Sequence, residues 1–386
     1  MRQTGADAEG AFVNELRTRC ERSQYLFGKI IMGYDLLTPT LHLPLCNAMQ
    51  APPPWRRLLL LPRGHLKTTI LKTQALHAVI QPGTPRTDGT FENVYFPQGI
   101  GALTHARGTS TRILFASRGA DLARSTLSEI MVAAEENQLL KALWPSAMWD
   151  DPRKQARWWN QERIVFPRQD HYKEATIETI GVGGQITGYH FNMHIFDDLV
   201  DINDANSPTT MQTAIEWWRA SRALMDDPDR TLEYTVGTRW AVADLYEYII
   251  RNDPTVEPIV RRVVEGGEPI FPERFSIDTV NRLQRELGSM FPLLYMNSAT
   301  DPTLTDFNMD KVRRFWMSDG KVCYDENEHD ALAIERRQLA AQLREGLEAA
   351  AAARAEGREP TGKTGRYDVF RARTEYLRRG RHVRFE

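Results

Sequence analysis

LLLLPRGHLKTT, residues Leu58–Thr69, joins a run of four leucines to a short turn and then to a lysine followed by two threonines. The leucines predict a buried strand, and the residues from Lys67 onward predict the start of a helix. In such an arrangement backbone N–H groups face an anion, a lysine reaches the outer phosphates and a hydroxyl holds Mg²⁺. The stretch therefore predicts a polyphosphate-binding loop.

The spacing of this loop departs from the usual pattern G-x-x-x-x-G-K-[ST]. Counting back from Lys67, the two glycine positions hold Leu61 and Leu66. The motif is incomplete when taken alone, so its interpretation depends on partner motifs elsewhere in the chain.

The composition of the 386-residue chain is that of an ordinary globular protein, with 41% hydrophobic residues, 26% charged residues and a net charge of −2. This balance gives no overall signature of a nucleic-acid-binding protein, although an average hides local patches. The three cysteines form no C-x-x-C pair and are odd in number, which fits a reducing compartment. No apolar stretch resembles a signal peptide or approaches the roughly 20 residues that span a bilayer. The chain is predicted to be cytosolic and not secreted.

Predicted strands and helices alternate through the central part of the chain. The strands are Arg57–Leu61, Arg112–Ala116, His194–Phe196, Leu232–Gly237 and Ile259–Val264. The helices are Lys67–Ile80, Ala120–Asn137, Met211–Met225 and Val242–Arg251. This alternation predicts an α/β fold with a mainly parallel sheet flanked by helices, and Arg163–Phe166 with Ala175–Ile180 as a hairpin. Ligands of such folds bind at the carboxyl ends of the strands.

Three regions are predicted along the chain. They are an N-terminal helical region, a core and a helical extension with a basic tail: residues 1–56, 57–306 and 307–386. Within the core, residues 81–111 are rich in Gly, Pro and Thr and predict a surface excursion. The extension predicts one long exposed helix at residues 331–357. The tail, residues 361–386, carries a net charge of +5, and is either a docking element or a disordered solubilising end.

The segment MHIFDD, Met193–Asp198, is an apolar strand that ends in two aspartates. This is the pattern of a Walker B motif, in which Asp197 holds Mg²⁺ and the next residue, usually Glu, acts as a general base. Here Asp198 takes that position with a side chain one methylene shorter. The alternative is that the two aspartates merely begin a loop.

Further polar residues follow the ends of predicted strands. Thr238 is placed to sense a γ-phosphate, and Arg239 follows it; the alternative is a polar turn. Arg118 and Arg124 are candidates for an arginine supplied to a neighbouring subunit's site, or are solvated helix arginines.

Other residues of these types favour structural roles. His190 and His194 lie four apart around a strand and need not converge on a metal, so structural histidines are favoured over a zinc site. The pairs Trp158–Trp159 and Trp217–Trp218 favour packing over stacking on DNA.

Five segments resemble, in their order and spacing, the large terminase subunit of tailed bacteriophages, the ATP-driven motor that packages DNA. They are PRGHLKTT, RILFASRG, GGQITGYHFNMHIFDDLVD, TVGTRWAVADL and PERFSIDTVNRLQRELGSMFPLLYMN. The resemblance extends from about Glu15 to Asp306. It implies a P-loop NTPase fold of the ASCE type, with ATP and Mg²⁺ as cofactors and hydrolysis coupled to translocation of double-stranded DNA.

The resemblance also implies roles for individual residues. It assigns the Walker A turn to Arg63, Gly64, His65, Leu66, Lys67, Thr68 and Thr69. In this assignment Lys67 contacts the phosphates, and Thr68 holds Mg²⁺ together with Asp197. Asp198 takes the catalytic position and Thr238 the coupling motif.

Two further assignments stay open. The arginine that stabilises the transition state is either Arg63 in cis or an arginine of a neighbouring subunit, for which Arg118 and Arg124 are the candidates. Residues Tyr25–Phe27, upstream of the loop, are a candidate adenine site.

The partners implied are double-stranded DNA, a portal protein, a small terminase subunit and further copies of the chain in a pentameric ring, in the host cytoplasm. Two features depart from the family: Leu66 stands where glycine is common, and the residues after Gly320 are too few for the usual nuclease domain. No nuclease activity is therefore expected, and a separate nuclease is a candidate partner. The alternatives are an ATP-binding clamp or assembly protein that does not hydrolyse ATP, and a helicase-like P-loop enzyme.

Overall fold

The computed structural model describes residues 2–50, 52–82, 94–95, 108–185, 188–298, 315–318 and 321–324. The chain divides into two compact units, Met1–Ala299 and Thr300–Glu386. In the second unit the described part is one antiparallel hairpin, β10 (Phe315–Ser318) with β11 (Lys321–Tyr324), which the sequence did not predict. The predicted helix at 331–357, the basic tail and most of the excursion at 81–111 lie outside the described residues.

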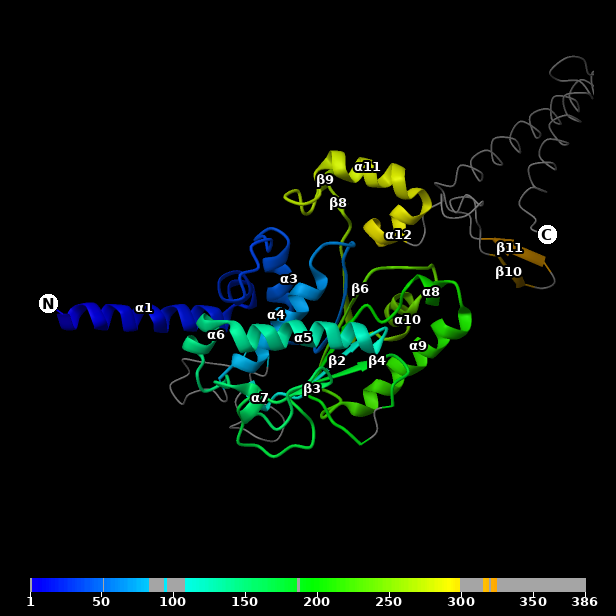
Figure 1. Ribbon diagram of the computed structural model, residues 1–386. Helices are drawn as coiled ribbons and strands as arrows, with labels where there is room; N and C mark the ends of the chain where they lie inside the picture. The colour runs from blue at the N-terminus through cyan, green and yellow to red at the C-terminus, as the bar shows by residue number, and fades with distance from the viewer. Residues whose placement is uncertain are drawn as a thin grey trace, which may run out of the picture. The chain divides into compact units, whose positions relative to one another are not determined.

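The first unit is built on a seven-stranded sheet with the order β3-β4-β2-β5-β6-β1-β7 (Figure 1). The strands are β1 (Arg56–Leu60), β2 (Ile113–Ser117), β3 (Arg163–Ile164), β4 (Ile177–Gly181), β5 (Met193–Asp197), β6 (Leu232–Gly237) and β7 (Val256–Val260). Every pairing is parallel except that of β3 with β4, which forms the predicted antiparallel pair. The prediction of a mainly parallel α/β sheet flanked by helices is confirmed.

Helices and short turns connect these strands. The longer helices are α1 (Arg2–Arg22), α3 (His42–Met49), α4 (Lys67–Ile80), α5 (Ala120–Glu136), α9 (Pro208–Ser221), α10 (Leu245–Asn252) and α11 (Ile277–Leu287). The shorter ones are α2 (Gln24–Leu26), α6 (Gln138–Leu143), α7 (Pro152–Gln155), α8 (Ile202–Ala205) and α12 (Phe291–Met296), with a π-helical turn at Phe27–Ile31. A small antiparallel pair, β8 (Val264–Glu265) with β9 (Glu268–Pro269), follows β7.

The sheet is covered on both faces because its strands are apolar on both sides. Leu59, Phe115 and Ile195 point to one face and pack with α3, α4 and α5. Leu60 and Phe196 point to the opposite face and pack with α9 and α10. The result is a three-layer arrangement in which the carboxyl ends of the parallel strands share one edge.

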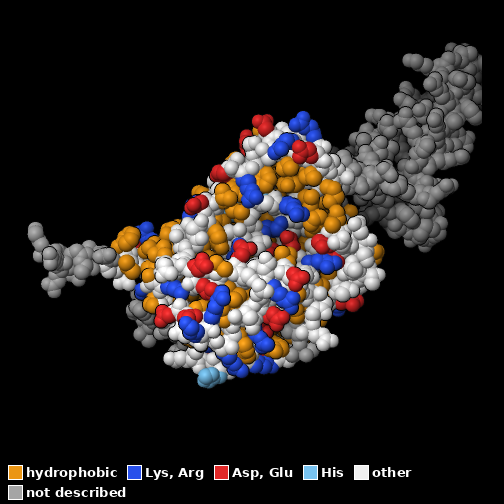
Figure 2. Space-filling view, in the orientation of Figure 1, with side chains coloured by type: hydrophobic (Ala, Val, Ile, Leu, Met, Phe, Trp, Pro, Cys, Tyr) orange, Lys and Arg blue, Asp and Glu red, His pale blue; other side chains and the backbone are white. Residues whose placement is uncertain are grey.

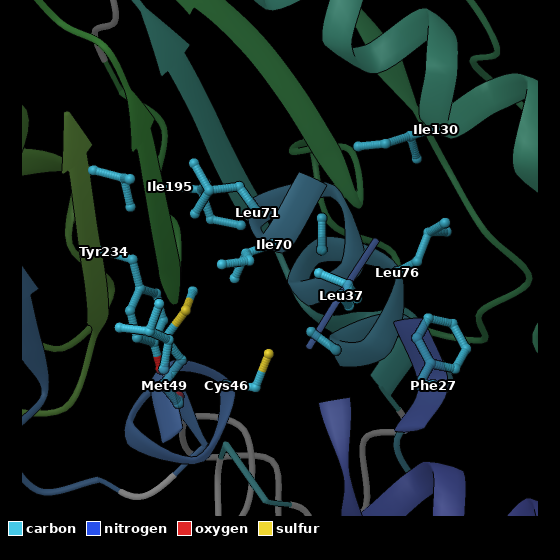
Figure 3. Close-up of a cluster of buried hydrophobic side chains, with 14 of the residues drawn as sticks. Phe27, Leu37, Cys46, Met49, Ile70, Leu71, Leu76, Ile130, Ile195 and Tyr234 are labelled. Atoms are coloured by element: carbon cyan, nitrogen blue, oxygen red, sulfur yellow. Dashed lines mark hydrogen bonds between the residues drawn. The ribbon is translucent and has the colours of Figure 1, made fainter. Parts of the chain in front are cut away.

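Helix α4 is anchored in the larger of these two cores (Figure 3). Ile70 and Leu71 from its second turn lie among side chains of the sheet and of α3, including Ile195, Tyr234 and Met49. All of these side chains are buried. Since the first residue of α4 is Lys67, this packing fixes where the predicted phosphate-binding turn meets the helix.

Several boundaries differ from the predictions. The predicted helix Met211–Met225 ends at Ser221 and continues as a 3₁₀ turn, and the predicted strand Ile259–Val264 lies instead at Val256–Val260. Among the residues that the structure describes, no helix combines the length and apolar character needed to cross a bilayer.

Candidate functional site

A cavity of about 540 Å³ lies at the carboxyl ends of β1, β5 and β6. Its walls come from the loop before α4, the turn after β2, the turns after β5 and β6, and one residue from the segment before α11. The lining residues are Arg63, Gly64, Leu66, Lys67, Thr68, Thr69, Arg118, Gly119, Leu122, Asp198, Val200, Asp201, Thr238, Trp240 and Arg274. This volume suits a small-molecule ligand of nucleotide size.

The loop before α4 contains two residues with positive φ. Gly64 has φ +80°, which glycine adopts without strain, and Leu66 has φ 59°, in the left-handed region. A left-handed conformation costs a non-glycine residue roughly 1–2 kcal/mol. Leu66 is also the residue that precedes α4, and it offers no side-chain cap to the first turn. The strain therefore falls at the position where glycine was expected, beside helix N–H groups that have no side-chain partner.

Lys67 lies on the floor of the cavity and is 8% exposed. Its Nζ lies 3.4 Å from the carbonyl oxygen of Leu61 and contacts the hydroxyl of Thr238. Thr238 is adjacent because β6 pairs directly with β1, which places the end of β6 beside the start of the loop. The structure thus brings together two residues that are far apart in the sequence and that the resemblance had placed in one site.

Thr68 connects the loop helix to the end of β5. Its Oγ1 donates a hydrogen bond of 2.7 Å to Oδ2 of Asp197. The other oxygen of Asp197 is buried and accepts no hydrogen bond from a described residue, and the same holds for Oδ1 of Asp198. Two carboxylates with buried, unpartnered oxygens beside a hydroxyl form a donor set that suits a hard cation.

Burial, and next the charge of Asp198, raise the pKa of the Asp197 carboxyl to about 7. A bound cation would favour the ionised form and lower that pKa again. Among the described residues no group of three or more His, Cys, Asp or Glu could hold a metal ion. Mg²⁺ does not require one, because in nucleotide sites it takes one or two carboxylates and completes its shell with phosphates and water.

Asp198 adopts φ 46°, the second strained residue of the site. Its N–H donates to the carbonyl oxygen of Val236, and its own carbonyl accepts from the N–H of Arg118. Aspartate tolerates the left-handed region better than most residues, which gives a backbone reason for Asp at the position where Glu was expected.

The predicted arginines divide by their partners. Arg118 lines the cavity of its own chain, where Nε and Nη2 donate to the two carboxylate oxygens of Asp204 at 2.9 and 3.1 Å. Arg124 does not line this cavity and pairs with Asp121 and Glu162. Arg63 lines the cavity, is exposed, and pairs with no described carboxylate.

Arg239 has a structural role instead. It is 6% exposed and donates to Asp244 at 3.0 Å and to Glu247 at 2.9 Å, so it holds the turn after β6 against α10. Its neighbour Trp240 does line the cavity. Arg239 thus stabilises the turn that carries Thr238 and Trp240.

Tyr25 and Phe27, the ends of the candidate adenine segment, are buried in the core and are not among the residues that line the cavity. The Tyr25 hydroxyl donates to Leu37, and Phe27 packs edge-on against Trp144. The structure does not place an adenine site there. The apolar side chains that do reach the cavity are Leu66, Leu122, Val200 and Trp240.

His194, Trp217 and Trp218 have the predicted packing roles, whereas His190 is exposed. His194 is buried within β5 beside Phe191 and Phe196, and burial lowers its pKa to about 3. Trp217 and Trp218 are buried in the core formed with α10.

Among the charged and aromatic residues that line this cavity, the sequence did not predict Asp201, Trp240 and Arg274. All three lie inside segments that carried the family resemblance, GGQITGYHFNMHIFDDLVD, TVGTRWAVADL and PERFSIDTVNRLQRELGSMFPLLYMN, but no local pattern assigned them to the cavity.

No protein-family model matches this chain, and no curated protein matches its sequence.

Proposed function

We propose that this chain is a P-loop ATPase that uses Mg²⁺ and couples ATP hydrolysis to the movement of double-stranded DNA, as in the large terminase subunit that its sequence resembles. One observation carries the proposal. The loop helix and the end of β5 meet through the 2.7 Å hydrogen bond from Thr68 to Asp197, with the ammonium group of Lys67 beside them. Lys67, Thr68 and Asp198 line the cavity, and the buried Asp197 joins them through Thr68. A cation and carboxylates at one cavity are what a magnesium–triphosphate complex requires.

The residues of the cavity fit distinct roles in hydrolysis. Lys67 and the free N–H groups at the start of α4 bind the phosphates. Thr68 and Asp197 would hold Mg²⁺, which when bound neutralises charge on the phosphate oxygens. Asp198 orients the attacking water as general base.

Thr238 supplies the link between nucleotide and sheet. In this structure its hydroxyl contacts Lys67 and donates to the carbonyl of Leu61 at 3.2 Å. A phosphate that takes over the Lys67 ammonium would remove this contact from the end of β6. Nucleotide binding would therefore change the contacts at the end of β6.

The coupling to DNA rests on the family resemblance. In the view of Figure 2, basic and acidic side chains are interspersed over the face shown. Contacts to DNA would be mainly to phosphates, so binding is expected to weaken with salt and to depend little on sequence. A portal protein, a small terminase subunit, a separate nuclease and a ring of identical subunits are part of the same proposal, with action in the host cytoplasm.

The test is steady-state ATP hydrolysis by the full chain, with and without linear double-stranded DNA. We expect Mg²⁺-dependent turnover that DNA increases, and loss of turnover in Lys67→Ala. Lys154→Ala is the matched control, because Lys154 is exposed and its one ion pair among the described residues is with Asp151 on the surface. Nucleotide binding without turnover would support the non-hydrolysing clamp instead. Separation of DNA strands would support the helicase-like enzyme.

A further inference from the structure

The segment Phe271–Phe275, FPERF, packs directly against the loop before α4. The ring of Phe275 stacks on His65 with centroids 4.7 Å apart and planes 9° apart, and Phe271 meets the same imidazole edge-on at 5.7 Å. A Cβ added to Gly64 would lie 2.8 Å from Cζ of Phe275. Burial lowers the pKa of His65 to about 4, so this is a contact between neutral rings. The loop and the segment are therefore fixed relative to each other.

This contact determines where Arg274 lies. Arg274 directly precedes Phe275 in the chain, and it lines the same cavity as Lys67. Its side chain is exposed and pairs with no described carboxylate; its contact in the structure is with the ring of Phe275, 5.9 Å from the guanidinium carbon to the centroid. By contrast, Arg118, which also lines the cavity, is paired with Asp204.

We propose that Arg274 is a phosphate-binding residue of this cavity, delivered to it by the stacking of Phe275 on His65. The proposal rests on the proposed function, because it assigns a further contact to the same nucleotide. A guanidinium without an acidic partner is free to donate its fork of N–H groups to phosphate oxygens. With Lys67 and Arg63 it would give three cations for the charges of a magnesium–triphosphate.

The test compares Arg274→Gln with Arg282→Gln. Arg282 lies on α11, is exposed and does not line the cavity, so it controls for loss of one charge from the same region. Two probes are titrated with Mg²⁺ present: a fluorescent ATP analogue and inorganic tripolyphosphate, which lacks the base and the sugar. We expect Arg274→Gln to weaken both about tenfold or more, Arg274→Lys to retain part of the affinity, and Arg282→Gln to match the wild type.

The outcomes separate this inference from the function on which it rests. If the wild type binds neither probe, the proposed function fails. If the wild type binds both and Arg274→Gln binds them equally well, only the role of Arg274 is overturned. If the variant loses affinity for the ATP analogue but not for tripolyphosphate, Arg274 contacts the nucleoside and the phosphate assignment is wrong. Melting temperatures measured without ligand show whether each variant is folded.

Discussion

The two ends of the seven-stranded sheet treat their charged residues differently. At the amino ends of the strands, buried charges meet opposite charges. Arg112 pairs with Asp226 at 2.7 Å, and Arg222 pairs with Glu233 at 3.3 Å and with Asp253 at 2.6 Å. Such pairs fix neighbouring strands and leave little charge for a ligand.

At the carboxyl ends Arg118 and Arg239 are paired with carboxylates, but other charged residues form no ion pair with a described residue. Asp197 and Asp198 form no ion pair with a described lysine or arginine, and Arg63 and Arg274 pair with no described carboxylate. Backbone strain is also gathered here, at Leu66 and Asp198. Strained residues and charges without partners are often found together at functional sites. Whether a charged residue has an ion-pair partner, and not its charge alone, separates the residues that stabilise the fold from those that remain available to a ligand.

The largest expected effect is on turnover at the carboxyl end. Asp198→Asn should lower the rate of ATP hydrolysis on the order of 10²–10⁴-fold, because it removes the group proposed to orient water. Nucleotide affinity should change little. Asp226→Asn makes the same chemical change at the amino end, and below its melting temperature it should leave turnover unchanged. Equal losses in both variants would break the comparison.

Substitutions at the amino ends of the strands should instead lower the free energy of unfolding. Arg222→Ala leaves the carboxyl group of Glu233, 1% exposed, without its ion pair. Removing one partner of a buried pair costs roughly 3–5 kcal/mol. Urea unfolding should show this loss. Arg219 is an exposed arginine of α9, the helix that ends next to Arg222, and Arg219→Ala should change the free energy of unfolding by less than about 0.5 kcal/mol. A small effect of Arg222→Ala would show that its pairs do not hold the fold.

A third prediction concerns pH. The pKa of Asp197 is raised to about 7 in the folded chain, against about 4 when unfolded. The folded state therefore binds the proton more tightly, and the nucleotide-free protein loses stability as pH rises from about 4 to 7. Asp197→Asn removes this pH dependence because an amide does not titrate in this range. The amide oxygen can still accept the hydrogen bond from Thr68.

Without Mg²⁺ or nucleotide, we expect Asp197→Asn to exceed the wild type in unfolding free energy at pH 8 by roughly 1–3 kcal/mol. The difference should shrink towards pH 5. Denaturation at both pH values measures it. A wild type that is the more stable protein at pH 8 would contradict the picture of an uncompensated carboxylate.

The smallest expected effect tests the strain at Leu66. Leu66→Ala and Leu66→Gly lose the same packing but differ in their tolerance of φ 59°. Leu66→Gly should be more stable than Leu66→Ala by about 1 kcal/mol. The same two substitutions at Leu122, inside α5, should give the opposite order by a similar amount. Thermal unfolding of the four variants compares the two sites. If the Gly variant is the less stable of the two at both positions, Leu66 is not strained.

Much of the fold follows from local pattern. The apolar run before Pro62, the strand that ends at Asp197 and the strand Leu232–Gly237 all lie where the sequence predicts them. The helix that begins at Lys67 does as well. These elements are predictable because strand and helix periodicity depend on neighbours within a few residues.

The arginines could not be assigned in this way. The sequence suggested that Arg118 serves a neighbouring subunit, but in the structure Arg118 donates to Asp204 of its own chain. The sequence suggested no role for Arg274, which lines the cavity. Tyr25–Phe27, the candidate adenine segment, is likewise not in the lining of the cavity, because nearness to the loop in sequence did not bring these side chains to it. Pairings between segments 80 or more residues apart are set by how helices pack on the sheet.

By itself, the sequence determined the α/β order of this protein, the loop with Lys67 and Thr68, and the strand that delivers Asp197. Hydrophobic periodicity and turn chemistry are local, so they are written in the chain. Only the tertiary structure decided which charges are partnered, since burial and ion pairing depend on what the folded chain places opposite each group. In the folded chain Thr68 donates to Asp197 at the end of β5, Arg118 donates to Asp204, and Arg274 lies at the cavity beside Phe275.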